Sequence, residues 1–375
     1  MAETIRALGL MSGTSMDGVD AAMLETDGET ISAFGPSRFM AYAPGETDAL
    51  SAVAADWRRF RPAAGGDAAI LAAAEREVVS LHAGAAARLI AEAGAAPELI
   101  GFHGQTVAHA PEEGWTWQLG DGAALARALN RPVVWDFRSA DMKVGGEGAP
   151  LAPFFHFALA RRIGGSAPVA FLNIGGVANV TWVDPARPAP EAEGALLAFD
   201  TGPGNALVND WMMRRAGAAM DEGGRAAAAG RVHRDRLSSN AARAYLERRP
   251  PKSLDRNAFS ALLAAMEGLS LEDGAATLTA LTVDCVAEAL RWSPSPPSRW
   301  LVCGGGRRNG AMMALLAERL GAPVEPVEAA GLDGDMLEAQ AFAWLAVRVL
   351  RGLPTSAPST TGCAAPVSGG RIARP

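Results

Sequence analysis

Lysine is nearly absent from this chain of 375 residues: only Lys143, in DMKVG, and Lys252, in PPKSL, are present. A phosphate-binding P-loop requires Gly-Lys followed by Ser or Thr, and a protein kinase requires a lysine in a strand similar to VAIK. Neither lysine stands in such a sequence. Both of these nucleotide sites are therefore excluded.

Cysteine, positive charge and long apolar runs are also scarce. The three cysteines, Cys285, Cys303 and Cys363, form no CxxC pair, which argues for a reducing compartment and against a zinc site of that type. The net charge of −7 argues against nucleic acid or an anionic membrane as a partner. The N-terminus lacks a signal-peptide pattern, and the most apolar run, APLAPFFHFALARR, is too short to span a bilayer. We therefore expect a cytoplasmic protein that binds neither nucleic acid nor membrane.

Apolar strands alternate with segments of helical periodicity, which indicates an α/β protein. A strand, a glycine turn and a second strand are predicted at 6–25, and the same unit recurs at 169–183. Two such hairpins facing a cleft suit a two-lobed phosphotransfer fold, although chance similarity between two hairpins is the simpler alternative. Residues 66–97 predict one long helix or two, and ISAFGPSRFMAYA predicts a pair of strands.

The first hairpin turn, in GLMSGTSMDGVD, combines glycines, hydroxyl groups and carboxylates. Backbone N–H groups of such a turn bind phosphate oxygens, and Ser12, Thr14 and Ser15 add hydroxyl donors. Asp17 or Asp20 would hold Mg²⁺ through water, because this ion prefers carboxylates, waters and substrate phosphates. The alternative is a turn whose Ser and Thr side chains bond only their own backbone.

Two later segments have candidate functional residues directly after a predicted strand. Asp200, in LLAFDTGPGNALVNDW, is expected to end a strand and open a Gly-Pro-Gly loop, where a carboxylate suits a general base. The alternative is an aspartate that caps its own loop. The three glycines of LVCGGGRRNGAMM let a flat ligand lie against bare backbone, or simply form a tight turn into a helix; they do not match G-x-G-x-x-G.

A middle group of polar side chains lies on loops between predicted strands, in GFHGQTVAHAP, WQLGDG and WDFRSADMKVGGEGAP. Such groups suit a sugar or amide ligand, and an arginine among them can pair with a ligand carboxylate. For each one, a hydrogen bond within the protein is the alternative. The members are His103, Gln105, Thr106, Gln118, Asp121, Arg138 and Glu147.

Several segments occur together in one order: GLMSGTSMDGVD, HGQT, DFRSADMKVGGEGAPLAP, LNIGGVANV, FDTGPGN, CGGGRRN and EAQAFAWLA. In this combination the chain resembles, from about residue 6 to its tail, the 1,6-anhydro-N-acetylmuramic acid kinases of bacterial cell-wall (peptidoglycan) recycling. That family belongs to the sugar kinase/actin/heat-shock ATPase superfamily. The resemblance implies two ribonuclease-H-like lobes, each a mixed sheet flanked by helices, closing on ATP and Mg²⁺. We expect lobes at 1–135 and 136–375, with the option that the final helix packs back on the first.

The implied reaction opens the anhydro bridge of the sugar with water and phosphorylates O6, giving N-acetylmuramic acid 6-phosphate. Asp200 would then deprotonate the water that attacks C1. The resemblance places Thr106, Arg138, Gly202, Gly204, Asn205 and Glu338 at the sugar. It places ATP and its phosphates at Gly9, Ser12, Gly13, Thr14, Ser15, Asp17, Gly18, Asn173, Gly175, Gly176, Gly304, Gly305, Gly306 and Asn309.

Two other functions stay open at this point. The chain could be another sugar kinase of the superfamily, in which Asp200 deprotonates an ordinary sugar hydroxyl. It could also be a non-catalytic nucleotide-binding regulator or chaperone-like ATPase, although no basic recognition helix or extra domain is visible. The oligomeric state, with a homodimer as one option, is not decided by the sequence.

Overall fold

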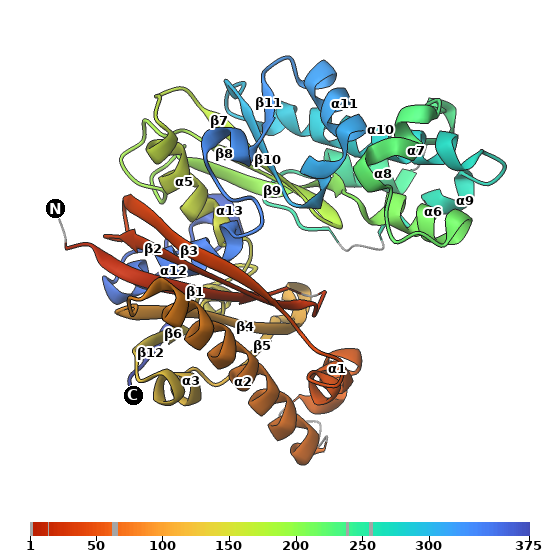
Figure 1. Ribbon diagram of the computed structural model, residues 1–375. Coiled ribbons are helices and arrows are strands. Elements are labelled where there is room, and N and C mark those ends of the chain that lie inside the picture. The colour runs from red at the N-terminus through yellow and green to blue at the C-terminus, as the bar shows by residue number, and fades with distance from the viewer. Residues whose placement is uncertain (1–2, 14, 62–66, 238–239, 255–257) are drawn as a thin grey trace. The chain divides into compact units, whose positions relative to one another are not determined.

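A computed structural model describes residues 3–13, 15–61, 67–237, 240–254 and 258–375 (Figure 1). It divides the chain into two compact units, Met1–Arg162 with Met336–Pro375, and Ile163–Asp335. Each unit contains one mixed sheet with helices, which confirms the predicted α/β class. Among the described residues, no helix is long and apolar enough to cross a membrane.

The sheet of the first unit is an antiparallel meander continued by parallel strands. Its order is β12-β6-β4-β1-β2-β3, with β5 also paired to β4. Strands β1, β2 and β3 are antiparallel, whereas β4 runs parallel to β1 and β6 runs parallel to β4, as expected for a ribonuclease-H-like core. The strands are β1 (Ile5–Ser12), β2 (Gly18–Thr26), β3 (Ile31–Ala41), β4 (Leu99–Ala110), β5 (Trp115–Leu119), β6 (Val133–Trp135) and β12 (Arg371–Ala373).

Helices cover both faces of this sheet. They are α1 (Asp48–Ala55), α2 (Ala68–Ala93), α3 (Gly122–Leu129), α4 (Ser139–Lys143), α5 (Ala152–Ile163), α12 (Leu337–Leu350) and α13 (Pro358–Thr361), with short 3-10 turns η1 (Trp57–Phe60) and η2 (Pro111–Glu113). The long alanine-rich segment forms the single helix α2, which Asp67 caps by accepting from Ala69 N and Ile70 N. The strand pair predicted at 31–43 is instead one strand, β3 (Ile31–Ala41), which stays paired with β2 through shifts in register.

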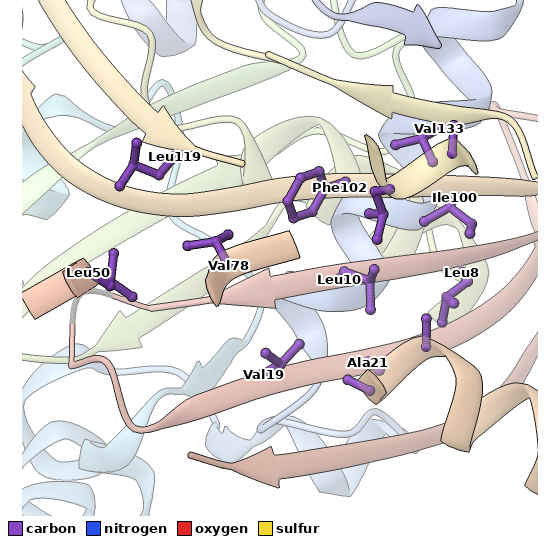
Figure 2. Packing of buried hydrophobic residues seen from close by; sticks show 14 of the residues in the cluster. Leu8, Leu10, Val19, Ala21, Leu50, Val78, Ile100, Phe102, Leu119 and Val133 are labelled. Atoms are coloured by element: carbon purple, nitrogen blue, oxygen red, sulfur yellow. The ribbon is translucent and has the colours of Figure 1, made fainter. Parts of the chain in front are cut away.

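The alternation of side chains decides which helix lies on which face. Leu8 and Leu10 of β1 pack with Phe102 of β4 and Val78 of α2 (Figure 2). The residue between them, Gly9, points the other way, because successive strand residues face opposite sides. A Cβ atom on Gly9 would lie 1.7 Å from the carbonyl oxygen of Ala339 in α12. Helices α2 and α12 therefore cover opposite faces of the sheet.

The first unit continues past residue 135, where the sequence had suggested a boundary. Arg138 Nη2 lies 2.9 Å from His103 Nε2 on β4, and Arg162 donates to the carbonyl oxygen of Ile31 on β3 over 2.6 Å. These contacts keep 136–162 with the first sheet. The chain then passes to the second unit, and the segment from Met336 onward belongs again to the first.

The second unit repeats the same sheet plan. Its order is β11-β10-β7-β8-β9, with β7, β8 and β9 antiparallel and β10 and β11 continuing in parallel. The β7–β8 hairpin corresponds to β1–β2, so the sequence recurrence at 169–183 has a structural counterpart. The strands are β7 (Val169–Ile174), β8 (Val177–Val183), β9 (Leu196–Pro203), β10 (Trp300–Cys303) and β11 (Val324–Pro326).

The helices of the second unit pack in apolar clusters around α10. They are α6 (Ala206–Ala216), α7 (Arg225–Ala229), α8 (Asn240–Glu247), α9 (Leu262–Ala265), α10 (Leu271–Ala289) and α11 (Gly310–Leu320). Short 3-10 turns lie at η3 (Glu222–Gly224), η4 (Arg234–Leu237), η5 (Leu290–Trp292), η6 (Gly305–Arg308) and η7 (Val327–Ala330).

Candidate functional site

The turn between β1 and β2 presents polar groups at the end of the first hairpin. Ser15 and Asp17 are exposed, and Ser15 Oγ donates to Asp17 Oδ1 over 2.8 Å. Ser12 is fully buried and its hydroxyl donates to the carbonyl oxygen of Gly104 over 3.4 Å. Asp20 is half-buried on β2, and Thr14 lies outside the described residues. The turn thus has one exposed hydroxyl–carboxylate pair and one hydroxyl used for internal bracing.

The two glycines that flank this turn within the strands serve packing. Gly9 allows α12 to approach β1, as described above. A Cβ atom on Gly18 of β2 would lie 2.4 Å from Met40 O and 2.5 Å from the Phe39 ring. Gly13 lies in the turn itself, where its carbonyl oxygen accepts from Met16 N over 3.1 Å. Gly13 is therefore the glycine of this set that lies in the turn and not within a strand.

Gln105, in HGQT, braces the turn from the neighbouring strand. Its Nε2 donates to the carbonyl oxygen of Gly13 over 2.9 Å and to that of Thr106 over 3.3 Å. Its Oε1 is buried and has no hydrogen-bond partner among the described residues. The hydroxyl of Thr106 accepts from Gln118 Nε2 over 3.3 Å. The strand that was expected to contact the sugar thus also holds the β1–β2 turn in place.

Arg138 is fixed by a histidine that sequence reasoning had listed without a role. Its Nε and Nη2 lie 3.2 and 2.9 Å from His103 Nε2, and its Nη1 donates to Gly148 O over 2.8 Å. His103 Nδ1 lies 2.8 Å from the carbonyl oxygen of Gly104, to which it donates, so Nε2 is the acceptor of a neutral ring. Burial, together with the Arg138 charge, holds the pKa of His103 well below its ordinary value. His103 therefore orients Arg138 without sharing its charge.

Glu338, at the start of α12, is the acidic neighbour of Arg138. The pKa of Arg138 is lowered to about 10 by burial, with Glu338 and Asp141 acting in the opposite direction. The side chain of Glu338 is accessible to solvent, yet the protein atoms around it raise the pKa of its carboxyl by desolvation, against the effect of Arg138. The first unit therefore places an oriented guanidinium within electrostatic reach of a carboxyl group whose pKa is raised by desolvation.

A cavity of about 290 Å³ lies in the first unit, and His103, which contacts Arg138, is one of its lining residues. His103, Trp117, Trp135, Asp121 and Asp136 are among its lining residues. Aromatic faces with hydrogen-bond acceptors around them suit a neutral ligand that has apolar faces and hydroxyl or amide donors.

In the second unit, Asp200 lies inside β9 beside a β-bulge rather than at the end of the strand. Asn179 pairs with Asp200 and Ala178 with Gly202, so Thr201 is the extra residue. Such bulges re-aim side chains near active sites. Asp200 Oδ2 accepts from the backbone N–H of Leu254 over 2.8 Å, and its side chain is half-buried. The carboxylate is therefore held and still partly accessible.

The loop after Asp200 is tied to the second hairpin. Asn205 N donates to Gly175 O over 2.7 Å, and Gly204 N donates to Gly176 O over 2.9 Å. Asn205 Nδ2 donates to the carbonyl oxygen of Ile174 over 3.0 Å, so this side chain does not cap α6. A Cβ atom on Gly202 would lie 2.7 Å from Cys285 Cβ. These residues shape the loop that follows the proposed base.

The triple-glycine turn after β10 packs against the same hairpin. Gly304 has φ +70°, and a Cβ atom there would lie 2.3 Å from Asn173 Oδ1. Gly306 lies against Ile174, and Gly305 is exposed. Asn309 caps α11, since its Oδ1 accepts from Met312 N over 3.0 Å. Gly305 is thus the glycine of this turn whose backbone is open to a ligand.

The sequence is similar to a known family over nearly its whole length. Residues 5–375 match the family model described as anhydro-N-acetylmuramic acid kinase. The anhydro-N-acetylmuramic acid kinase of Ruegeria sp. (strain TM1040) is 55% identical over 371 residues, which cover 99% of this chain and 95% of that protein. The protein of the same name from Cereibacter sphaeroides is 57% identical over 369 residues, covering 98% and 96%.

A solved structure of a ROK family glucokinase from Streptomyces griseus, in complex with glucose and AMPPNP, covers 91% of this chain and 99% of its own. Its identity is 16% and its TM-score 0.41, a likeness too distant to inform the site.

Proposed function

The chain belongs to the anhydro-N-acetylmuramic acid kinase family, and we propose that it uses ATP to convert 1,6-anhydro-N-acetylmuramic acid into N-acetylmuramic acid 6-phosphate in one coupled reaction. Family membership makes it a kinase of a small sugar in cell-wall recycling. The ring-opening mechanism, the base and the site residues are our proposal. We place the reaction in the cytoplasm, where ATP is available.

In this mechanism Asp200 takes a proton from the water that attacks C1. The C1–O6 bond breaks through an oxocarbenium-like transition state, as in glycoside cleavage. O6 then takes the γ-phosphoryl group of ATP, and ADP leaves. Because phosphorus replaces the proton that O6 would otherwise need, no separate acid has to protonate the leaving oxygen. The partly accessible Asp200 carboxylate, oriented by the Leu254 N–H, is the observation that carries this proposal.

Residues of the first unit would hold the sugar. The substrate carries a lactyl carboxylate, which an oriented guanidinium such as that of Arg138 can bind. The cavity lined by Trp117 and Trp135 suits the uncharged sugar ring or its acetamido group. Thr106 and Glu338 complete the proposed sugar-binding set in this unit. Gly202, Gly204 and Asn205 shape the loop around Asp200 in the second unit.

The exposed turn at Gly13, Ser15 and Asp17, with the turns at Gly175–Gly176 and Gly304–Gly306, would receive the nucleotide. Among the described residues, no group of three or more His, Cys, Asp or Glu could hold a metal ion alone. Single carboxylates such as Asp17 and Asp20 fit an ion that arrives on substrate phosphates, which is how Mg²⁺ usually binds in kinases. When bound, Mg²⁺ supplies neutralisation of the phosphate charge.

The product mass tests this proposal. Purified protein is incubated with ATP, Mg²⁺ and 1,6-anhydro-N-acetylmuramic acid, and the sugar product is weighed by mass spectrometry. A gain of one phosphoryl group and one water supports coupled ring opening. A gain of the phosphoryl group alone would mean that an ordinary hydroxyl is phosphorylated. Unchanged anhydro sugar, with activity on another sugar, would contradict the substrate.

A further inference from the structure

One segment of the second unit contacts Asp200 at three points. The Tyr245 hydroxyl donates to the carbonyl oxygen of Asp200 over 2.7 Å. Asp200 N donates to the carbonyl oxygen of Lys252 over 3.0 Å. Leu254 N donates to Asp200 Oδ2 over 2.8 Å. The segment 245–254 therefore fixes both the backbone and the carboxylate of the proposed base.

Lys252 closes this segment on itself. Its side chain is buried, at 4% exposure, and Nζ donates to the carbonyl oxygens of Tyr245 and Leu246 over 3.1 and 3.3 Å. Nζ also lies 4.5 Å from the centre of the Tyr245 ring and 5.7 Å from that of Phe199, which precedes Asp200. The ammonium group thus joins the end of α8 to the residues that hold Asp200.

The choice of lysine at this position calls for an explanation, because the chain uses arginine almost everywhere else. A buried cation is costly unless it is paired, and a compact ammonium can donate to two neighbouring carbonyls at a helix C-terminus, where positive charge is favoured. Burial, together with Arg291 and Arg248, lowers the pKa of Lys252 to about 8, whereas Cys285 and Asp200 act in the opposite direction. The protein keeps a charge there at a cost, which points to a role beyond packing.

We propose that Lys252 and Tyr245 are positioning residues for Asp200, and that the Lys252 ammonium closes the segment 245–254 into a clasp that aims the Asp200 carboxylate. This inference rests on the proposed function, in which Asp200 is the base. Neither residue needs to touch the substrate. The clasp acts by holding the Leu254 N–H and the Asp200 backbone in fixed places.

The first test is kinetic and uses Lys252→Met and Tyr245→Phe, which keep most of the side-chain volume. A base displaced by about 1 Å can lose about 10²-fold in rate, so kcat should fall by about that factor in Lys252→Met and less in Tyr245→Phe. The KM values for ATP and sugar should stay within about twofold, because these residues hold the base and bind no substrate. In Lys252→Met, the acid limb of the kcat–pH profile should move to higher pH, because the loss of a nearby positive charge disfavours the charged form of Asp200.

Two controls separate positioning from general damage. Lys143→Met removes the only other lysine, which is exposed on α4. Leu269→Ala truncates a buried side chain of the cluster that contains Tyr245. Both should leave the pH profile in place. If Leu269→Ala shifts the profile as Lys252→Met does, the effect is structural and the proposal is wrong.

The second test does not depend on turnover. With only two lysines, protein labelled with ¹³C at lysine Cε gives two assignable NMR signals. We expect the Lys252 signal to titrate well below that of Lys143, and to move when Asp200 is changed to Asn while the Lys143 signal stays. Identical titration of the two lysines, or no response to Asp200→Asn, would overturn the clasp.

The combined outcomes distinguish the two levels of the proposal. A wild-type protein that leaves the anhydro sugar unchanged contradicts the proposed function and, with it, the role of the clasp. A wild type that opens the ring and loses activity in Asp200→Asn, with Lys252→Met and Tyr245→Phe both at wild-type kcat, contradicts the clasp alone. Loss of kcat at constant KM, with the pH shift and the NMR response, supports it.

Discussion

The hairpins of the two units occupy the same place in the same sheet plan, yet their turns are used differently. In the first unit the turn exposes Ser15 and Asp17 and is braced from β4 by Gln105. In the second unit the carbonyl groups of the turn, at Gly175 and Gly176, accept from the loop that follows Asp200. The first turn exposes polar side chains, whereas the carbonyl groups of the second turn are tied to the loop that follows Asp200. The same hairpin thus presents polar side chains in one unit and anchors a neighbouring loop in the other.

The close packing of the first sheet gives the largest expected effect. Gly9→Ala would drive a Cβ atom into the carbonyl oxygen of Ala339, so we expect a loss of about 3 kcal/mol of unfolding free energy. Gly84→Ala, in α2 with open space around it, is the matched control and should gain about 0.5–1 kcal/mol. Urea unfolding measures both. Equal stabilities would mean that α12 does not lie as close to β1 as described.

Because Arg138 is proposed to bind the sugar and Asp200 to act as the base, we expect them to affect different kinetic constants. Arg138→Met should raise the KM for the sugar by about 10²-fold, since a charge-assisted hydrogen bond to a carboxylate is lost, and change kcat much less. Arg127→Met, exposed on α3, is the control. Steady-state kinetics with varied sugar decides the matter. A fall in kcat at constant KM would place Arg138 in the chemical step instead.

The brace between strand and turn predicts a smaller, nucleotide-specific effect. Gln105→Leu removes the donor to Gly13 O, and we expect the KM for ATP to rise by about tenfold, the equivalent of one hydrogen bond. The KM for the sugar should change less. If the sugar KM rises and the ATP KM does not, Gln105 belongs to the sugar site, as the sequence alone had allowed.

The buried lysine also predicts a pH dependence of stability. The pKa of Lys252 in the folded chain is lowered to about 8, below its ordinary value of 10.5. The unfolded chain therefore binds this proton more tightly, and this group makes the wild type more stable as pH rises through that window. Lys252→Met should lack this rise. Urea unfolding of both proteins at neutral pH and above pH 10 tests it; parallel curves would contradict the burial of the charge.

The sequence was sufficient for the class of fold and suggested the correspondence of the two hairpins, because strand alternation and glycine turns are local signals. It was not sufficient for Gly9, whose neighbour Ala339 lies near the other end of the chain. It also placed Asp200 at a strand end, whereas β9 continues past it through a bulge that local sequence does not announce.

Other site features depend on partners distant in the sequence. His103 was listed as polar, but only the fold shows that its neutral ring orients Arg138. Asn205 and Asn309 both stand at the N-terminus of a helix, yet only the Asn309 side chain caps its helix, because the Asn205 amide donates to Ile174 O instead. Lys252 was dismissed because it fits no P-loop, and its contacts with α8 become visible only in three dimensions.

The most direct test of the central claim is the fate of the water oxygen. Wild type and Asp200→Asn are incubated with ATP, Mg²⁺ and 1,6-anhydro-N-acetylmuramic acid in ¹⁸O-labelled water, and the product is analysed by mass spectrometry. Because the C1 oxygen of the free sugar exchanges slowly with water, the product is quenched and weighed at early times. We predict ¹⁸O at C1 and phosphate at O6 for the wild type, with both halves of the reaction lost together in Asp200→Asn. Ring opening or phosphorylation that persists alone in the variant would contradict the assignment of Asp200 as the base of a coupled reaction.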